Sequence, residues 1–468
     1  MLNKTENLLQ GHLLKHIEEN GSSLNKGWQN SSLREEAFST FKKIGLPTSK
    51  NEKWRGTNLS KLYSKEIVFE KSAGEYNKNL DEIFVCEVQG FDTQTVSMLN
   101  GWFYSSENEK LVIHENGLIV GSIFAAQQQF PELFDKHFNT VAKTDTHGLI
   151  AANAALFTDG LFIYVPDGVI VEKAIQLIKM INRDDNLMVN SRNLIVLGKN
   201  SQLSFLHCDD SINQSPSFIN TVTEVVVSEN AHFCLHKLQN VNDASSLINS
   251  TFIKQEKNST SKVNVITYNG GLIRNEFYVD LVGEGADADL NGVYLMDKKQ
   301  HIDNQVYVKH AVPNCTSSEL FKGVLDEEAS GVFNGYIFVE RDAQNTVAFQ
   351  QNNNILLSSN AKIDTQPFLE IYADDVKCSH GATVGQLDTE ALFYMKQRGI
   401  GHDDALLLLM FAFTAEVTSK IGIESLRQSI EDMIKKRLRG ELSICDKCVL
   451  HCSIPDHPIE FDIDLSKI

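Results

Sequence analysis

The spacing of hydrophobic residues changes twice along the chain and divides it into three parts. Up to about residue 155 these residues recur mainly at helical intervals, as between Leu33 and Ile44, and Gly45 then ends that helix. The pattern also predicts a short strand pair at residues 101–104 and 110–120, and helices at 131–141 and 148–156. We therefore expect residues 1–155 to form an N-terminal, mostly helical domain.

Residues 156–386 contain short β-rich segments separated by Asn, Asp, Gly and Ser. The clearest predicted strands are residues 161–165, 174–180, 193–197, 221–227, 263–268, 276–282 and 292–295. Two mainly β architectures fit this core: a pair of sandwiches or barrels, and a parallel β-helix. The polar run 350–354, Gln-Gln-Asn-Asn-Asn, fits a β-helix in which amide side chains stack between coils. It fits a solvated loop equally well.

The third part, residues 387–440, is helical again. The pattern predicts helices at 389–398 and 403–421, and the first half of the second is almost entirely apolar, so we expect it to be largely buried. A third helix carries hydrophobic residues from Ile423 to Leu438 on one face, and Gly440 ends it. Residues 441–468 then form a separate tail that contains cysteines.

The charge balance excludes some classes of partner. The chain has 43 Lys and Arg against 61 Asp and Glu, a net charge of −18, so it lacks the basic character of a nucleic-acid or anionic-membrane binder. Eight cysteines in 468 residues are too few for a disulfide-dense secreted scaffold. No signal-peptide pattern appears, and the longest apolar run is far shorter than the ~20 residues of a membrane span. We expect a cytoplasmic protein with free thiols.

The sharpest local chemical signal is Cys378-Ser-His380, at the end of a predicted extended strand over residues 369–380. Side chains alternate along a strand, so Cys378 and His380 share one face. A thiol and an imidazole can hold a metal ion or a sulfur species together, but two ligands make an incomplete site. A partner would have to supply the rest. By residue type alone, a buried cysteine beside a hydrogen-bonded histidine is the commoner arrangement.

The tail contains a second candidate metal site. Cys445, Cys448 and Cys452 have C-x2-C-x3-C spacing, with His451 and His457 close by. This spacing suits a zinc or iron–sulfur site, although a second C-x2-C pair is missing. The alternative is a tail with oxidisable thiols.

Enzyme motifs are missing or incomplete. The chain has no G-x-x-x-x-G-K-[ST], hence no P-loop, and residues 283–288 match G-x-G-x-x-A but precede a predicted strand where a dinucleotide site needs a helix. One alternative function is a β-helix enzyme that acts on carbohydrates with clustered carboxylates. Its candidate residues are Asp287, Asp289, Asp326, Glu327 and Glu328, most of them near predicted turns.

Two motifs resemble a known family. Residues 373–385 (ADDVKCSHGATVG) with 392–400 (LFYMKQRGI), and residues 45–48 (GLPT) with 51–57 (NEKWRGT), are similar to signatures of the SufB/SufD family of iron–sulfur cluster assembly proteins. The resemblance covers about residues 30–440. The SufB branch typically has His-Glu-Ala-Thr where this chain has His-Gly-Ala-Thr at 380–383, which points to the SufD branch.

The resemblance implies a right-handed parallel β-helix flanked by helical domains. It implies a non-catalytic scaffold subunit that pairs with SufB through the end of the β-helix and docks the ATPase SufC through residues 387–440. ATP would bind only to SufC, and a cysteine desulfurase system would supply sulfur indirectly.

The resemblance also assigns a site. His380, and after it Cys378, would assist iron acquisition and transient cluster formation together with a SufB cysteine. Reduced flavin is implied for the complex, but no motif here places it. The cysteine-bearing tail is not part of the family pattern. A purely structural adaptor for the ATPase, without metal chemistry, is the remaining alternative.

Overall fold

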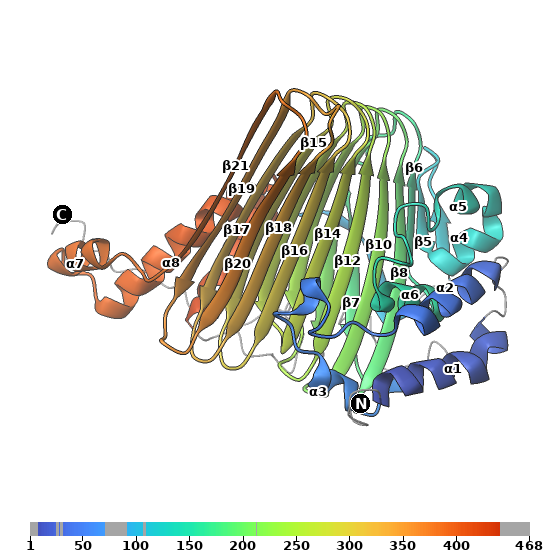
Figure 1. The fold of residues 1–468 in the computed structure, drawn as a ribbon, viewed down its shortest axis with the longest axis horizontal. Helices are drawn as coiled ribbons and strands as arrows, with labels where there is room; N and C mark the ends of the chain where they lie inside the picture. The colour runs from blue at the N-terminus through green and yellow to red at the C-terminus, as the bar shows by residue number, and fades with distance from the viewer. Residues whose placement is uncertain are drawn as a thin grey trace.

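The central strands coil into a parallel β-solenoid of about seven turns (Figure 1). This computed structural model describes residues 8–24, 28, 31–70, 91–105, 109–211 and 213–439. The chain alternates between two sheets, so each coil adds one strand to each sheet and every strand of the coils pairs in parallel with the strand two further along the chain. The predicted parallel β-helix is therefore confirmed.

Sheet A has the order β20-β18-β16-β14-β12-β10-β8-β6-β5-β4, with β1 paired to β8. Its strands are β1 (Val68–Phe69), β4 (Leu111–Ile113), β5 (Ile119–Ser122), β6 (Leu161–Val165), β8 (Leu187–Leu197), β10 (Ser217–Val227), β12 (Ser246–Gln255), β14 (Leu272–Leu281), β16 (His301–His310), β18 (Ser330–Val339) and β20 (Lys362–Ile371). Sheet B has the order β21-β19-β17-β15-β13-β11-β9-β7-β2-β3. Its strands are β2 (Thr93–Leu99), β3 (Trp102–Tyr104), β7 (Ala174–Ile181), β9 (Gln202–Ser211), β11 (His232–Asn240), β13 (Thr260–Asn269), β15 (Asp287–Met296), β17 (Thr316–Leu325), β19 (Thr346–Leu356) and β21 (Val376–Gly385).

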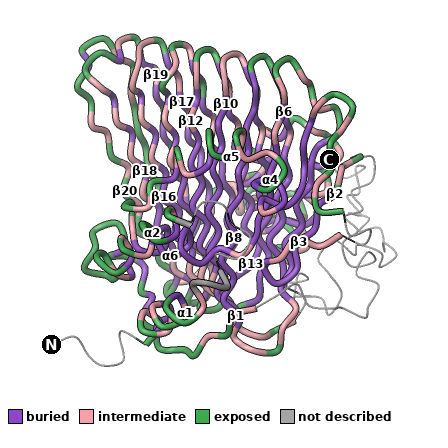
Figure 2. Tube along the Cα trace, turned by 90° about the vertical axis from the view of Figure 1, so that its right-hand side faces the viewer, coloured by how far each residue is buried: buried purple, intermediate pink, exposed green. Residues whose placement is uncertain are grey.

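The corners of the coil repeat a backbone conformation that asparagine tolerates. Asn200, Asn230, Asn258 and Asn314 each have a φ between 53° and 60°, at the corner between a sheet A strand and the next sheet B strand. Asparagine enters this left-handed region more easily than other residues with a Cβ. The Asn200 amide donates to the Glu229 carbonyl of the next coil, and Asn230 and Asn258 repeat the contact, so the corners stack. Figure 2 shows buried residues along the strands and exposed ones at the corners.

The interior between the sheets is mainly hydrophobic but contains polar columns. Asn249, Asn275 and Asn304 occupy one register position on three neighbouring strands, and the Asn275 side chain donates to Asn304 at 3.0 Å. In an earlier coil, the buried Lys179 and Lys237 lie 3.6 and 3.4 Å from Asp209 carboxylate oxygens. The Asn275–Asn304 bond and the two Lys–Asp209 pairs lower the cost of burying these polar groups, whereas the buried Asn249 amide has no hydrogen-bond partner among the described residues.

The polar run 350–354 lies in β19, so the loop alternative is wrong. Asn352 and Asn354 are buried, and the Asn352 side chain donates to the Tyr294 hydroxyl at 3.0 Å. The run does not stack amide on amide between coils, because its register neighbours on β17 include Glu319 and Phe321. The interior position was predicted, but the one bond between two amides of the run lies within β19, where the Asn354 side chain donates to Asn352 at 2.7 Å.

The N-terminal region combines helices with strands that extend both sheets. Its helices are α1 (Leu8–Leu24), α2 (Ser31–Ile44), the short 3-10 helix η1 (Glu52–Trp54), α3 (Ser60–Tyr63), α4 (Ile123–Gln129), α5 (Pro131–His137) and α6 (Gly148–Leu156). The predicted strand pair is wrong in its pairing: β3 pairs with β2 in sheet B, and β4 pairs with β5 in sheet A. Sequence neighbours separate here because each strand completes a different sheet.

The segment before α3 packs on the outer face of sheet A. The Arg274 guanidinium lies 3.7 Å from the centre of the Trp54 ring, and Arg274 also pairs with Glu276 at 2.8 Å and with Asp303. The Thr57 hydroxyl donates to Asp303 as well. Trp54 and Thr57 belong to the motif 51–57, which thus fastens the N-terminal region to two neighbouring coils, those of β14 and β16.

The C-terminal helices are α7 (Thr389–Gln397), α8 (His402–Thr418) and α9 (Glu424–Leu438). The second half of α8 and all of α9 pack on the outer face of sheet B, through residues such as Met410, Val417 and Ile430. The first half of α8 is less buried than predicted, because it leaves the solenoid and leads to α7 (Figure 1). Within the described residues, no helix combines the length and apolarity needed to cross a membrane.

Candidate interface site at the open end of the solenoid

The last coil leaves both sheets with an open edge. β20 and β21 are the terminal strands of sheets A and B, and each pairs with a neighbour on one side only. Several apolar side chains are exposed there, including Phe349, Phe368 at 51%, and Tyr372 at 54%. Unpaired strand edges with apolar side chains are surfaces on which another strand can add. At the opposite end each sheet finishes in antiparallel pairs: β5 with β6 and β4 with β5 in sheet A, and β3 with β2 in sheet B.

An aromatic column on the outer face of sheet A leads to this edge. Phe252, Tyr278, Tyr307, Tyr336 and Phe368 occupy one register position on β12, β14, β16, β18 and β20. Successive ring centres are 4.7, 6.2, 5.1 and 5.0 Å apart. Offset rings at such distances stabilise the sheet beyond their buried area. The column ends on Phe368, one face of which has no further strand beside it among the described residues.

Cys378 and His380 lie on β21, at the open edge of sheet B. The predicted single strand 369–380 is wrong, because β20 ends at Ile371 and the chain turns before β21 begins at Val376. The turn is the corner of the last coil, where Ala373 is buried. The two side chains still lie on one face of a strand, because Cys378 and His380 both fall within β21 and are two residues apart.

The two side chains have different surroundings. Cys378 is partly buried against the apolar cluster that contains Ala348 and Ala373, and burial raises the pKa of its thiol. The thiol is therefore protonated near neutral pH. His380 is exposed. Within the described chain no group of three or more His, Cys, Asp or Glu side chains is placed to hold a metal ion. The metal-binding role of Cys378 and His380 stays a prediction.

Two polar residues that the sequence analysis did not connect with this site lie beside His380, on the next two strands of sheet B. Gln350 is the register neighbour of His380 on β19, and Glu319 is the neighbour of Gln350 on β17. The Gln350 amide donates to a Glu319 carboxylate oxygen at 2.6 Å. Burial raises the pKa of Glu319 to about 8, and the hydrogen bond from Gln350 opposes this only in part. The sequence offered little signal for them, because no strand was predicted at β17, where Glu319 lies on the inward face.

The other candidate residues fall into two groups. Cys445, Cys448 and Cys452 lie outside the described residues. The carboxylates of the carbohydrate-enzyme alternative do not line one groove: Asp287 and Asp289 are in β15, whereas Asp326, Glu327 and Glu328 form the turn before β18, at another corner.

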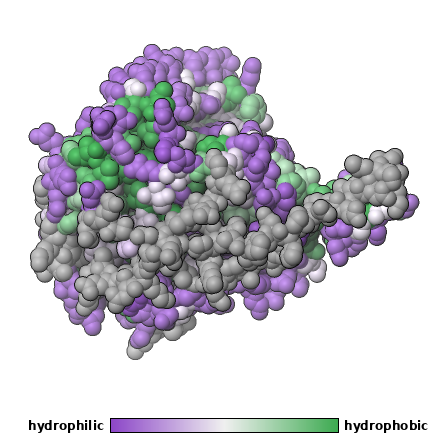
Figure 3. All heavy atoms as spheres, turned by 180° about the vertical axis from the view of Figure 1, so that it is seen from behind, coloured by the Kyte–Doolittle hydropathy of each residue, from purple (hydrophilic) through white to green (hydrophobic). Residues whose placement is uncertain are grey.

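An arm projects from the body beside the open end. The helix α7 has no buried residue, and Phe393 and Tyr394 are 64% and 59% exposed. The Arg398 guanidinium donates to the Tyr394 hydroxyl at 3.0 Å. Figure 3 shows this arm from behind, standing clear of the solenoid. Exposed aromatic residues on a projecting helix are typical of a protein interface.

The fold and the site together define a parallel β-solenoid protein with two unpaired strand edges at its last coil and a projecting helical arm. The SufBD core domain of the SUF iron–sulfur cluster system matches residues 180–413, and the SufBD N-terminal region matches residues 12–177. The chain belongs to the SufBD family of iron–sulfur cluster assembly proteins.

Its similar relatives include SufD proteins. It is 27% identical to the iron–sulfur cluster assembly protein SufD of Escherichia coli over 420 residues, which covers 89% of this chain and 95% of that one. It is 27% identical to SufD of Bacillus subtilis over 330 residues, covering 70% and 75%. A SufBD family protein of Synechocystis is 28% identical over 416 residues, covering 86% and 90%. The predicted resemblance to SufD is confirmed.

Proposed function

We propose that this chain is a non-catalytic scaffold subunit that pairs with a SufB subunit through β20 and β21. The observation that carries the proposal is the open end itself: two unpaired strand edges, exposed aromatic side chains, and a Cys/His half-site on the terminal strand. Strand addition by a partner would satisfy the free backbone groups and cover Phe368. The same contact would bring a partner thiolate to His380.

In this proposal His380 assists iron acquisition and the formation of a transient iron–sulfur cluster, which is cargo of the complex. A neutral imidazole is a good ligand for iron and accepts protons near neutral pH. Cys378 is a secondary ligand, because its thiol must first lose a proton that burial helps it keep. A cysteine desulfurase system would provide the sulfur. Reduced flavin is proposed to act at the level of the complex.

The arm of α7 and the first half of α8 is the proposed docking platform for the ATPase SufC. The helix α7 has no buried residue and stands away from the solenoid, so a partner can cover it without disturbing the core. ATP belongs to that partner, since this chain has no P-loop.

The test compares cluster formation by the wild-type complex and by a complex that carries His380→Ala, both purified without oxygen. We expect the variant complex to assemble, because β21 keeps its backbone, but to give much less cluster absorbance after addition of iron and sulfide. Cys378→Ser should reduce the yield less. Ser379→Ala is the matched control, because Ser379 lies between the two residues and points to the opposite face. Full cluster yield from His380→Ala would refute the role, and loss of the complex would make His380 structural.

A further inference from the structure

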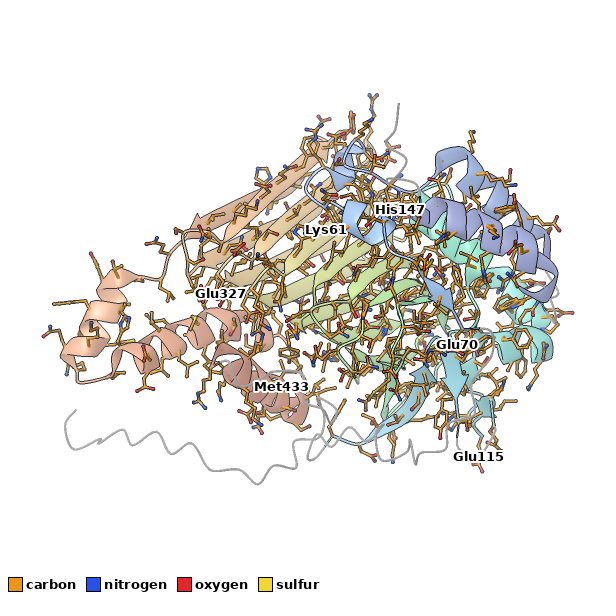
Figure 4. The ribbon with its side chains drawn as sticks, turned by 90° about the horizontal axis from the view of Figure 1, so that it is seen from below. Lys61, Glu70, Glu115, His147, Glu327 and Met433 are labelled. Atoms are coloured by element: carbon orange, nitrogen blue, oxygen red, sulfur yellow. The ribbon has the colours of Figure 1, made fainter. Side chains whose placement is uncertain are left out.

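A groove follows the corner of the solenoid where the strands of sheet A begin. Its floor contains the outward-facing residues that share one register position on β12, β14, β16, β18 and β20. These residues are Ser246, Leu272, His301, Ser330 and Lys362. The segment 55–65, which includes α3, and the corner turns at 243–245 and 299 line it further. We call it the corner groove; Figure 1 shows α3 beside the lower ends of these strands, and Figure 4 marks Lys61.

The corner groove has the dimensions of a short extended peptide. Five neighbouring strands at ~4.8 Å spacing give it a length of roughly 19 Å, which about six residues of extended chain would span. Its volume is about 580 Å³. Leu272 and Val332 provide apolar floor, while the cations lie around it.

The groove is basic although the chain is strongly acidic. Five cations line it, namely Arg55, Lys61, Lys65, Lys299 and Lys362, against two carboxylates, Asp243 and Asp364. Asp243 is already paired with Lys298 at 2.6 Å, outside this set. Among the described residues, only Lys299 of the five cations has a carboxylate within 4.0 Å, namely Glu328 at 3.5 Å. The unpaired cations favour an acidic occupant, and the −18 net charge disfavours a nucleic acid.

The chain carries a segment of matching chemistry outside the described residues. Residues 459–465 read Ile-Glu-Phe-Asp-Ile-Asp-Leu, in which acidic and apolar residues alternate strictly. In an extended conformation this alternation places Glu460, Asp462 and Asp464 on one face and the apolar residues on the other. The acidic face suits the lysines, and the apolar face suits Leu272 and Val332.

The described chain reaches Arg439 beside the same corner. Near the end of α9, Arg437 donates to Asp297 at 2.6 Å and to Gln300 at 3.4 Å, and Gln300 donates to Asp243 of the corner groove at 2.7 Å. The twenty residues between 439 and 459 can span up to about 66 Å. A connection of this length holds a segment at a local concentration in the millimolar range, so even a weak contact is occupied.

We propose that residues 459–465 bind in the corner groove as an extended strand, with Glu460, Asp462 and Asp464 facing its lysines. This contact would hold the cysteine run 445–452 beside the solenoid. The inference goes beyond the proposed function, and its test needs neither the partner subunits nor iron.

The experiment treats the full chain with a water-soluble carbodiimide, which joins an amine to a carboxylate in direct contact, and maps the products of the monomer by mass spectrometry. We expect links from Lys61, Lys65, Lys299 or Lys362 to the three tail acids. Their yield should fall at about 0.5 M salt, because exposed ion pairs are screened. The double variant Lys61→Glu/Lys362→Glu should lower the yield about tenfold.

Two further variants make the result specific. Lys257→Glu changes an exposed lysine at the opposite corner and should leave the links unchanged. Adding Asp462→Lys and Asp464→Lys to the double variant should restore links. The amines then lie at positions 462 and 464 of the tail, and the carboxylates lie at positions 61 and 362 of the groove. An undiminished yield of links in the double variant, links found only between chains, or no links to the tail would overturn the proposal. Coupling of added hexaglutamate to these lysines, without any tail link, would assign the groove to another protein and not to the tail.

Discussion

At the residue scale, burial decides the protonation of the groups near the open end. Glu319 is fully enclosed, and its neighbour Gln350 supplies one amide hydrogen bond, which is too little to offset the loss of water. Gly335 on β18 leaves the space that the Gln350 amide occupies, because a Cβ there would lie 2.0 Å from its nitrogen. The Gln350–Glu319 pair beside His380 therefore depends on Gly335, a glycine of the other sheet.

The raised pKa of Glu319 predicts a pH-dependent stability. Its pKa moves from the usual 4.5 to about 8 in the folded chain, so between these values the folded state keeps a proton that the unfolded state has lost. The free energy of unfolding must then fall as pH rises across this range, by at most about 1.4 kcal/mol per pH unit. Glu319→Gln keeps an acceptor for Gln350 and removes the titration. Its unfolding temperature should match wild type near pH 5 and exceed it at pH 8.

The control for this prediction is Glu327→Gln, at an exposed turn, which should shift stability little at either pH. Parallel pH profiles for wild type and Glu319→Gln would show that Glu319 is ionised in the folded state.

At the scale of elements, the N-terminal motif and the C-terminal arm have opposite relations to the solenoid. The segment 51–57 is fastened to sheet A by a buried network in which His147 also takes part, 2.8 Å from Glu276. Burial opposes ionisation of Glu276, but His147 and Arg274 together hold its pKa well below the usual range. By contrast, α7 has no buried residue. One element is structural, and the other is available to a partner.

Removing the Trp54 ring should loosen this N-terminal element. Trp54→Ala leaves a cavity over the Arg274 guanidinium, which costs about 3–5 kcal/mol in comparable buried sites. We expect faster hydrogen exchange across residues 51–63, with the strands of sheet B unchanged. Trp54→Phe retains an aromatic face and should lose far less, and Glu52→Ala, which is exposed, should have little effect. Unchanged exchange in Trp54→Ala would mean that other contacts hold the segment.

Charge and ring changes on the arm should weaken ATPase binding. Arg398→Glu alters an exposed side chain, and Phe393→Ala removes the most exposed of these aromatic rings. Each should lower co-purification of SufC while the solenoid keeps its β circular dichroism, because neither residue contacts the core. Lys257→Glu, on a distant corner, is the control. Undiminished recovery of the ATPase with both variants would place its docking surface elsewhere.

At the scale of the whole molecule, the two ends of the solenoid differ. The sheets finish in antiparallel strand pairs beside the first coil, whereas the parallel strands β20 and β21 end them without a cap in the described chain. Solenoids need capped ends to remain soluble, so an uncapped end favours a partner. A net charge of −18 limits self-association of such an edge.

The tail adds a possible second metal site to the whole chain. If Cys445, Cys448 and Cys452 bind metal through thiolates, the isolated full chain should contain zinc or iron that the triple variant Cys445→Ser/Cys448→Ser/Cys452→Ser lacks. Elemental analysis of the two proteins decides this. A chain ending at Gly440 should match the triple variant, and equal metal content in all three would leave the tail as a segment with oxidisable thiols.

Alternation along short strands is a local property, so the sequence alone predicted the mainly β core, the helices on either side and the shared face of Cys378 and His380. The family motifs removed the choice between architectures. Several strand bounds were close, since Asn and Gly mark the corners.

Only the tertiary structure decided which residues and strands of different coils are neighbours. Contacts between coils join residues about thirty positions apart, and a shift of one position in the register of a strand would exchange its inward and outward side chains. The turn before β21, the Glu319–Gln350 pair and the row of residues in the corner groove all depend on that register. The pairing of β3 with β2 likewise followed from completing two sheets, which no local pattern encodes.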